Sequence, residues 1–304
     1  MPRRQKSLKA KIHGKIERRI KRMKNNENNI ISIKIQGLDY SYNTDTHYEK
    51  DGHIYCKTCN EQIDGEPVEL INTKFIFTKA CRCDQERKRL EEERERQNKI
   101  ADIKRRCFVE RNQENFTFAN CDSHTDKALI GKLKKYVEEF EEMKKNNIGL
   151  IIYGGIGTGK TFLSCSVLNA VIEKYLYECK IINFSQILND LQKGGFNLDR
   201  NEYIGNLTSK TLLVFDDFGI ERDTEYALEQ IYNVINARYQ KEKPTIITTN
   251  LDYKDLENGG QDLMLSRIYS RIIEMGVPLK VDGSDRRKEK RMLKIEKAKN
   301  LMDK

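Results

Sequence analysis

The stretch from Leu150 to Thr161, LIIYGGIGTGKT, most constrains what this chain can fold into. It holds the pattern G-x-x-x-x-G-K-T between an apolar run, which predicts a buried strand, and a helical pattern that begins at Lys160. Glycines let such a loop curl so that its N–H groups point at a phosphate, and the helix N-terminus adds a positive dipole. The stretch therefore predicts a phosphate-binding loop between a strand and a helix.

ATP with Mg²⁺ is the ligand that such a loop predicts. We expect Lys160 to meet the β- and γ-phosphates and the Thr161 hydroxyl to hold the metal ion. The rest of the loop is expected to surround the phosphates with its backbone, through Gly154, Gly155, Ile156, Gly157, Thr158 and Gly159.

A second motif, TLLVFDD at 211–217, has four apolar residues followed by two acids. The apolar residues predict a central parallel strand, and such sheets bind ligands at the carboxyl ends of their strands. We expect Asp216 to hold Mg²⁺ through water and Asp217 to polarise the attacking water. The two acids extend the predicted phosphate site to the neighbouring strand.

The stretch PTIITTN at 244–250 predicts another buried strand with a polar end. Thr249 and Asn250 are expected beside the γ-phosphate, where they could orient a water molecule. Predicted strands and helices alternate through this part of the chain, which is typical of a parallel sheet. The fold class we predict is an α/β three-layer nucleotide domain.

Four of the eight cysteines form two close pairs, Cys56 with Cys59 and Cys81 with Cys83. The C-x-x-C and C-x-C spacings supply the four thiolates that a tetrahedral structural Zn²⁺ site needs. His53 could replace one thiolate, and four unligated thiols are the other interpretation. The segments 68–71 and 74–77 between the pairs predict a hairpin too small to fold without a metal.

The chain has no run of about 18 apolar residues, and its basic N-terminus lacks an apolar core segment. We therefore expect no membrane span, no secretory signal and a cytoplasmic protein, in which clustered cysteines favour metal over disulfides. The net charge of +9 favours an anionic partner, with nucleic acid as the first candidate.

Composition divides the chain into four parts. Residues 1–50 are predicted to be a basic arm and linker, residues 51–84 a zinc-binding module, residues 85–110 a charged, solvated connecting helix, and residues 111–304 the nucleotide domain with a basic C-terminal helix. The first 24 residues are very basic and could form a helix on a nucleic acid or an acidic protein, or could be a solvated tail.

Residues 111–287 resemble the DnaC/DnaI-type helicase loaders and the related IstB-type transposition ATPases of the AAA+ class. The resemblance rests on segments in the expected order, which are 116–118, 154–161, 214–219, 236–239, 244–250 and 284–286. An N-terminal cysteine cluster ahead of that domain also resembles loaders of the DnaI type and their phage-encoded versions.

The resemblance implies roles for single residues. Asp216 and Asp217 match the Walker B pair, Asn250 the sensor-1 residue and Arg286 the sensor-2 arginine. In the strap before the domain, the aromatic residues of 116–118 could line a base pocket or could pack in the core.

An arginine finger is also implied, and it supports a homo-oligomer assembled through the ATP interface. Arg271 matches the position of the finger, with Arg267 as the second choice. Such a residue acts on the nucleotide of a neighbouring subunit.

The resemblance implies an ATP-dependent loader that places a replicative hexameric DNA helicase on single-stranded DNA during initiation. The N-terminal part would bind the helicase, and the nucleotide domain would hydrolyse ATP with Mg²⁺. A transposition helper ATPase is one alternative. A zinc-stabilised nucleic-acid-binding adaptor, in which ATP serves only as a binding switch, is another.

Overall fold

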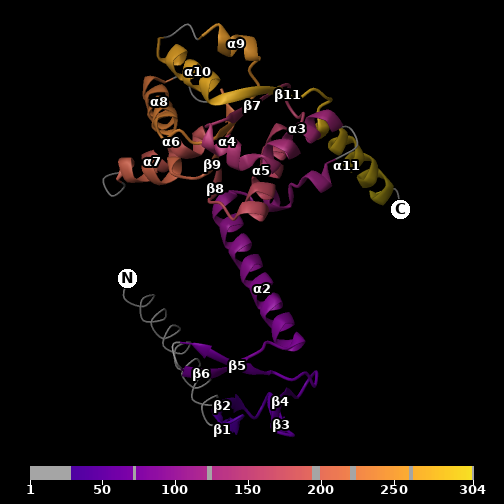
Figure 1. Cartoon of the computed structure of the whole chain (residues 1–304). Helices are drawn as coiled ribbons and strands as arrows, with labels where there is room; N and C mark the ends of the chain where they lie inside the picture. The colour runs from indigo at the N-terminus through magenta and orange to yellow at the C-terminus, as the bar shows by residue number, and fades with distance from the viewer. Residues whose placement is uncertain are drawn as a thin grey trace, which may run out of the picture. The chain divides into compact units, whose positions relative to one another are not determined.

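The computed structural model describes residues 29–70, 73–121, 125–193, 199–219, 224–259 and 263–302. The chain divides into two compact units, residues 1–96 and 97–304, whose elements are labelled in Figure 1. The basic segment 1–24, for which the sequence predicts an arm or a solvated tail, lies outside the described residues.

The first unit consists of antiparallel hairpins. They pair β1 (Ile30–Ile35) with β2 (Leu38–Asn43), β3 (His47–Lys50) with β4 (His53–Cys56), and β5 (Asp64–Leu70) with β6 (Thr73–Thr78). The last pair confirms the predicted hairpin. In the first two pairs, both turn residues have positive φ, at 36–37 and at 51–52, as tight two-residue hairpins require.

The expectation that residues 30–50 form a linker is wrong, because three strands lie there. These strands bury few side chains, but the sequence does carry a signal for the first two, because apolar and polar residues alternate at 31–35 and at 38–43 on either side of Gln36-Gly37. The described core of this unit is correspondingly small: Ile35, Tyr40, Ile54, Cys56, Ile63 and Cys81.

The charged helix α2 runs from Arg82 to Cys107 and crosses the boundary between the units. Its first turns are largely exposed, as predicted for a connecting helix. In its last turns Ile100, Ile103 and Cys107 are buried in the core of the second unit, so the expectation of a solvated helix is wrong there.

The described residues of the second unit form a five-stranded parallel sheet in the order β11-β7-β10-β9-β8. The strands are β7 (Gly149–Tyr153), β8 (Cys179–Asn183), β9 (Leu212–Phe218), β10 (Thr245–Thr249) and β11 (Gly276–Lys280). The parallel sheet predicted from the sequence is confirmed.

Side chains alternate across this sheet, and helices cover both faces (Figure 1). Leu150 and Ile152 pack on one side, with the end of α2, α3 (Lys127–Glu138), α4 (Phe140–Lys145) and α5 (Lys160–Tyr175). Ile151 packs on the other side, with α6 (Phe184–Lys193), α7 (Arg200–Thr208), α8 (Glu225–Gln240), α9 (Tyr253–Glu257) and α10 (Leu263–Met275). The predicted three-layer architecture is confirmed.

Three further elements position the site. The short 3₁₀ helices η1 (Arg111–Asn115) and η2 (Phe118–Asn120) form the strap before the nucleotide domain, and α11 (Arg286–Met302) follows the last strand. Within the described ranges, none of the helices has the length and apolar character to cross a bilayer.

Candidate nucleotide site and cysteine cluster

The phosphate loop lies between β7 and α5, as the sequence predicts. Three of its glycines have no room for a side chain, and a Cβ at Gly154 would lie 2.2 Å from the carbonyl oxygen of Val281. A Cβ at Gly157 would lie 1.9 Å from an oxygen of Asp285, and one at Gly159 would lie 2.9 Å from a guanidinium nitrogen of Arg286. Gly157 and Gly159 also have positive φ, at 76° and 102°. The loop therefore packs tightly against the residues that open α11.

Lys160 begins α5 with only 5% of its surface exposed. Its Nζ donates to the carbonyl oxygens of Gly154 and Gly155, at 2.9 and 2.8 Å, and to Oδ1 of Asn250 at 2.6 Å. Burial lowers the pKa of Lys160, and the nearby charge of Asp217 opposes that shift. The ammonium is thus held at the loop, where an anionic phosphate would stabilise its charge.

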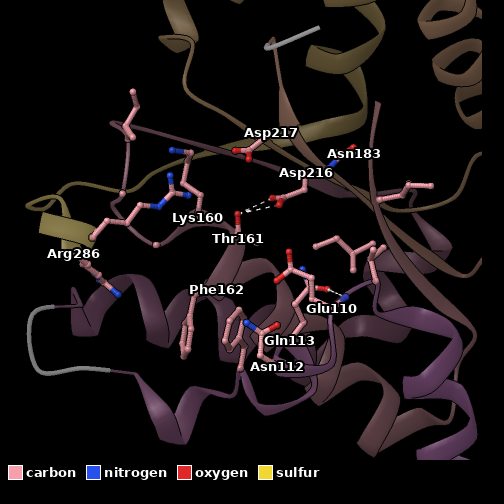
Figure 2. Close-up of a pocket in the computed structure, with 18 of the residues that line it drawn as sticks. Glu110, Asn112, Gln113, Lys160, Thr161, Phe162, Asn183, Asp216, Asp217 and Arg286 are labelled. Atoms are coloured by element: carbon pink, nitrogen blue, oxygen red, sulfur yellow. Dashed lines mark hydrogen bonds between the residues drawn. The ribbon is translucent and has the colours of Figure 1, made fainter. Parts of the chain in front are cut away.

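Asp216 is held by hydroxyl groups from two elements. Thr161 Oγ1 lies 3.0 Å from each carboxylate oxygen (Figure 2), and Thr248 Oγ1 donates to Oδ1 at 2.6 Å. Burial raises the pKa of Asp216, the hydrogen bond from Thr248 lowers it, and the charge of Asp217 raises it again. Buried oxygen donors beside a second carboxylate suit a hard divalent cation such as Mg²⁺.

An irregularity in β9 brings both acids to the pocket. Phe215 lies opposite Ile247 and Phe218 lies opposite Thr249, so one extra residue is inserted at 216–217. Consecutive residues of a regular strand point to opposite faces, whereas a bulge can re-aim a side chain. Asp217 has a φ of +54°, and both acids line the pocket.

The expectation that Thr249 lies beside the γ-phosphate is wrong. Thr249 Oγ1 donates to the carbonyl of Phe218 at 2.8 Å and accepts the N–H of Leu251 at 3.1 Å. The residue is fully buried and does not line the pocket. Because side chains alternate along β10, its neighbour Thr248 contacts the acids instead.

Lys160, Thr161, Asp216 and Asp217 line a cavity of about 870 Å³, a volume suited to a nucleotide (Figure 2). The strap forms one wall, where the ring of Phe116 packs against Phe162 with 4.9 Å between centroids. Phe116 and Phe118 both pack on the core, but only Phe116 also lines the cavity. Other lining residues belong to no motif that the sequence revealed: Glu110, Asn112, Gln113, Asn183 and Gln186.

The sensor-2 candidate Arg286 also lines this cavity, as does Arg287, which the sequence analysis did not select. Arg286 Nη2 donates to Thr125 Oγ1 at 3.0 Å, and its backbone N–H donates to the carbonyl of Gly157 at 3.2 Å. The start of α11 therefore belongs to the site.

The two finger candidates lie on α10 and do not line the cavity of their own chain. Arg271 donates to Oδ1 of Asn236 at 3.1 Å, and its guanidinium lies 5.0 Å from the ring centroid of Tyr232. Arg267 is exposed one turn earlier on the helix. A role at the γ-phosphate therefore requires a second copy of the chain.

In the first unit, the sulfur atoms of Cys56, Cys59, Cys81 and Cys83 all lie within 4.8 Å of one another. Tetrahedral Zn²⁺ with Zn–S bonds of about 2.3 Å would place its ligands roughly 3.8 Å apart, so the cluster fits this ion. The N–H groups of Cys59 and Thr58 lower the pKa of Cys56 to about 7, and burial raises the pKa of Cys81 to about 12.

His53 is not a member of the cluster, so the suggestion that it replaces a thiolate is wrong. Its Nδ1 lies 2.7 Å from Oδ2 of the buried Asp64. Asp64 also accepts the N–H of Ile54 at 2.7 Å. The imidazole ring of His53 therefore serves as a hydrogen-bond partner of a buried carboxylate.

Residues 82–294 match the family described as IstB-like ATP binding protein. The chain belongs to this family. The match spans well over half of the chain, and the sheet and the phosphate loop agree with it. The second unit of this family member is thus a P-loop AAA+ ATP-binding domain.

Named relatives of this family member include replicative helicase loaders. The loader DnaI of Bacillus subtilis (strain 168) is 22% identical over 248 residues, covering 77% of this chain and 78% of its own. The loader DnaC of Escherichia coli (strain K12) is 25% identical over 172 residues, covering 53% and 67%. A crystal structure of the DnaC helicase loader aligns with a TM-score of 0.49 at 22% identity, covering 57% of this chain and 100% of its own.

Proposed function

We propose that this protein uses ATP to load a replicative DNA helicase onto single-stranded DNA. The proposal rests mainly on the similarity to the helicase loader DnaI, which covers 77% of this chain. Residues 82–304 make up a smaller share of the chain than that, so the similarity must begin before residue 82. The similarity therefore extends into the unit that holds the cysteine cluster, beyond the family match at 82–294.

In this proposal ATP lies in the cavity with its phosphates at the loop. Lys160 would bind the β- and γ-phosphates, and Thr161 and Asp216 would hold Mg²⁺, which when bound neutralises phosphate charge. Asp217 would take up the proton of a water molecule that attacks the γ-phosphorus, while the bond to the leaving ADP oxygen breaks. Asn250 would fix Lys160, and positioning with charge neutralisation would supply most of the rate.

The first unit would bind the helicase. Its small core and four converging thiolates support a structural Zn²⁺ that braces the hairpins. A closed site with four protein ligands leaves no position for a catalytic water.

Two alternatives make different predictions. A transposition helper would share the nucleotide domain, and the family description includes IstB-like proteins. It should bind duplex DNA at least as tightly as single strands. An adaptor that uses ATP as a binding switch should bind ATP without DNA-stimulated turnover.

Purification of the protein from its own cell, followed by identification of its partners, tests the loader function. A hexameric helicase should co-purify, and recovery of a transposase without a helicase would contradict the proposal. DNA binding titrated in rising salt should weaken, because each phosphate contact releases counterions, and single strands should be preferred.

Two variants test the assigned chemistry. Lys160→Ala should abolish tight ATP binding, because the main contact to the phosphate charge is lost. Asp217→Asn should bind ATP but hydrolyse it far more slowly, because Thr161 and Asp216 remain. Parent-like hydrolysis by Asp217→Asn would show that the base is assigned wrongly.

A further inference from the structure

The Thr248 hydroxyl is bonded to both acidic residues of the ATP site. Its Oγ1 donates to Oδ1 of Asp216 at 2.6 Å and accepts the backbone N–H of Asp217 at 2.9 Å. Thr248 is completely buried in β10. The hydroxyl thus fixes the carboxylate of one acid and the backbone of the other.

The bond to Asp217 lies within the bulge of β9. There the backbone of Asp217 is left-handed, a conformation that non-glycine residues adopt only where the surroundings hold it. Without this acceptor, the part-buried N–H of Asp217 would lose its partner, and the bulge could relax toward a regular strand. One of the two acids would then turn away from the pocket.

The bond to Asp216 is one of two hydroxyl contacts to this carboxylate. Thr161 makes the other, and its oxygen is also the expected metal ligand. A hydroxyl has lone pairs as well as a proton, so Thr161 could hold a metal ion and still donate to Asp216. Thr248 differs because it also holds the backbone of Asp217. We propose that Thr248 is a positioning residue for ATP hydrolysis, acting through Asp216 and Asp217 without touching the nucleotide. This inference rests on the proposed ATPase function.

Thr248→Val and Thr248→Ser separate the hydroxyl from the shape of the side chain. We expect Thr248→Val to lower kcat at least roughly tenfold with little change in KM, the pattern of an interaction made mainly in the transition state. Without Mg²⁺, Thr248→Val should bind a fluorescent ATP analogue with the affinity of the parent. Added Mg²⁺ should raise the affinity of the variant less than it raises that of the parent. Thr248→Ser should restore most of both properties.

Thr249→Val is the matched control. It removes a hydroxyl that lies on the same strand, is equally buried and also makes two hydrogen bonds, but neither of these bonds reaches an acidic residue. This variant should lose stability as Thr248→Val does while keeping parent-like kcat and Mg²⁺ dependence.

Three results would overturn the positioning role. They are parent-like turnover and Mg²⁺ dependence in Thr248→Val, no rescue by Thr248→Ser, and an equal catalytic loss in Thr249→Val. A parent protein that binds ATP but never hydrolyses it would refute the proposed function instead. In that case the Mg²⁺-dependent gain in nucleotide affinity still decides whether Thr248 organises the acids.

Discussion

Replacement of Arg238 should destabilise the nucleotide domain strongly, although this residue does not line the pocket. Arg238 lies on α8 and is completely buried. Its guanidinium donates five hydrogen bonds at 2.5 to 3.3 Å, and no carboxylate is among their acceptors: Thr208 O, Lys210 O, Thr211 O, Pro244 O and Thr245 Oγ1. These acceptors lie at the end of α7, in the turn before β9 and at the start of β10, so one side chain ties α8 to the segments that lead into two strands of the sheet.

The magnitude follows from these bonds. Burial lowers the pKa of Arg238 to about 9, so the side chain is still protonated at pH 7. Arg238→Met would remove five hydrogen bonds, at about 1 kcal/mol each, while release from burying a cation offsets part of the loss. We expect a net loss of about 3–5 kcal/mol in the free energy of unfolding, which would lower Tm by roughly 6–20 °C for a unit of this size.

Urea unfolding followed by circular dichroism, with zinc present and nucleotide absent, measures this loss. Arg238→Lys keeps the charge but has only three donors, so it should fall between the parent and Arg238→Met. Arg200→Met, at an exposed position on α7, should stay within about 0.5 kcal/mol of the parent. A loss below about 1 kcal/mol for Arg238→Met would refute the reasoning, because the removal of five hydrogen bonds, three of them buried, should cost more than that.

Three further predictions concern the first unit and assembly. Cys59→Ser should remove stoichiometric zinc and unfold the first unit while ATP affinity persists; a zinc-free parent in metal analysis would contradict it. Burial raises the pKa of Asp64, but hydrogen bonds from His53 and Ile54 outweigh this and leave its pKa below the usual value. A carboxyl group whose pKa is lowered by folding stabilises the folded unit at pH values above its unfolded pKa. That stability is lost as the pH falls through the folded pKa. Asp64→Asn should therefore destabilise the unit at pH 7 and weaken the acid dependence of its unfolding, and an unchanged acid midpoint would count against this. Arg271→Ala should bind ATP but hydrolyse it poorly, and mixing with Lys160→Ala should restore activity because those subunits supply Arg271 in trans. Turnover per chain that is constant on dilution, with Arg271→Ala unaffected, would exclude the trans finger.

The second unit was largely predictable because its signals are local. β7 and β9 each contain a continuous apolar run, β10 has a shorter one at Ile246 and Ile247, and the glycine pattern of the phosphate loop is specified by the need for close backbone approach. The hairpin at 30–43 was missed although apolar and polar residues alternate in both of its strands, whereas the strand at 47–50 shows no such period. The packed end of α2 was missed because Ile100 and Ile103 are isolated apolar residues in a charged helix.

The details of the site depend on pairing between strands, which no local pattern reveals. Thr248 and Thr249 are identical neighbours, and only the register of β10 against the bulge of β9 decides which hydroxyl meets the acids. The polar wall formed by Asn183 and Gln186 likewise depends on β8 lying beside β9. Sequence reasoning therefore identified the acids but not the residue that organises them.

The same tertiary dependence links the phosphate loop to the C-terminal helix. The carboxylate of Asp285 lies where a side chain at residue 157 would be, and it also accepts the N–H of Arg287 at 3.0 Å in the first turn of α11. The backbone N–H of Arg286 in turn donates to Gly157. The phosphate loop thus packs directly against the residues that open α11, and this packing places Arg286 and Arg287 at the same cavity. The small size of Gly157 and Gly159 therefore serves the packing of these arginines as well as phosphate binding.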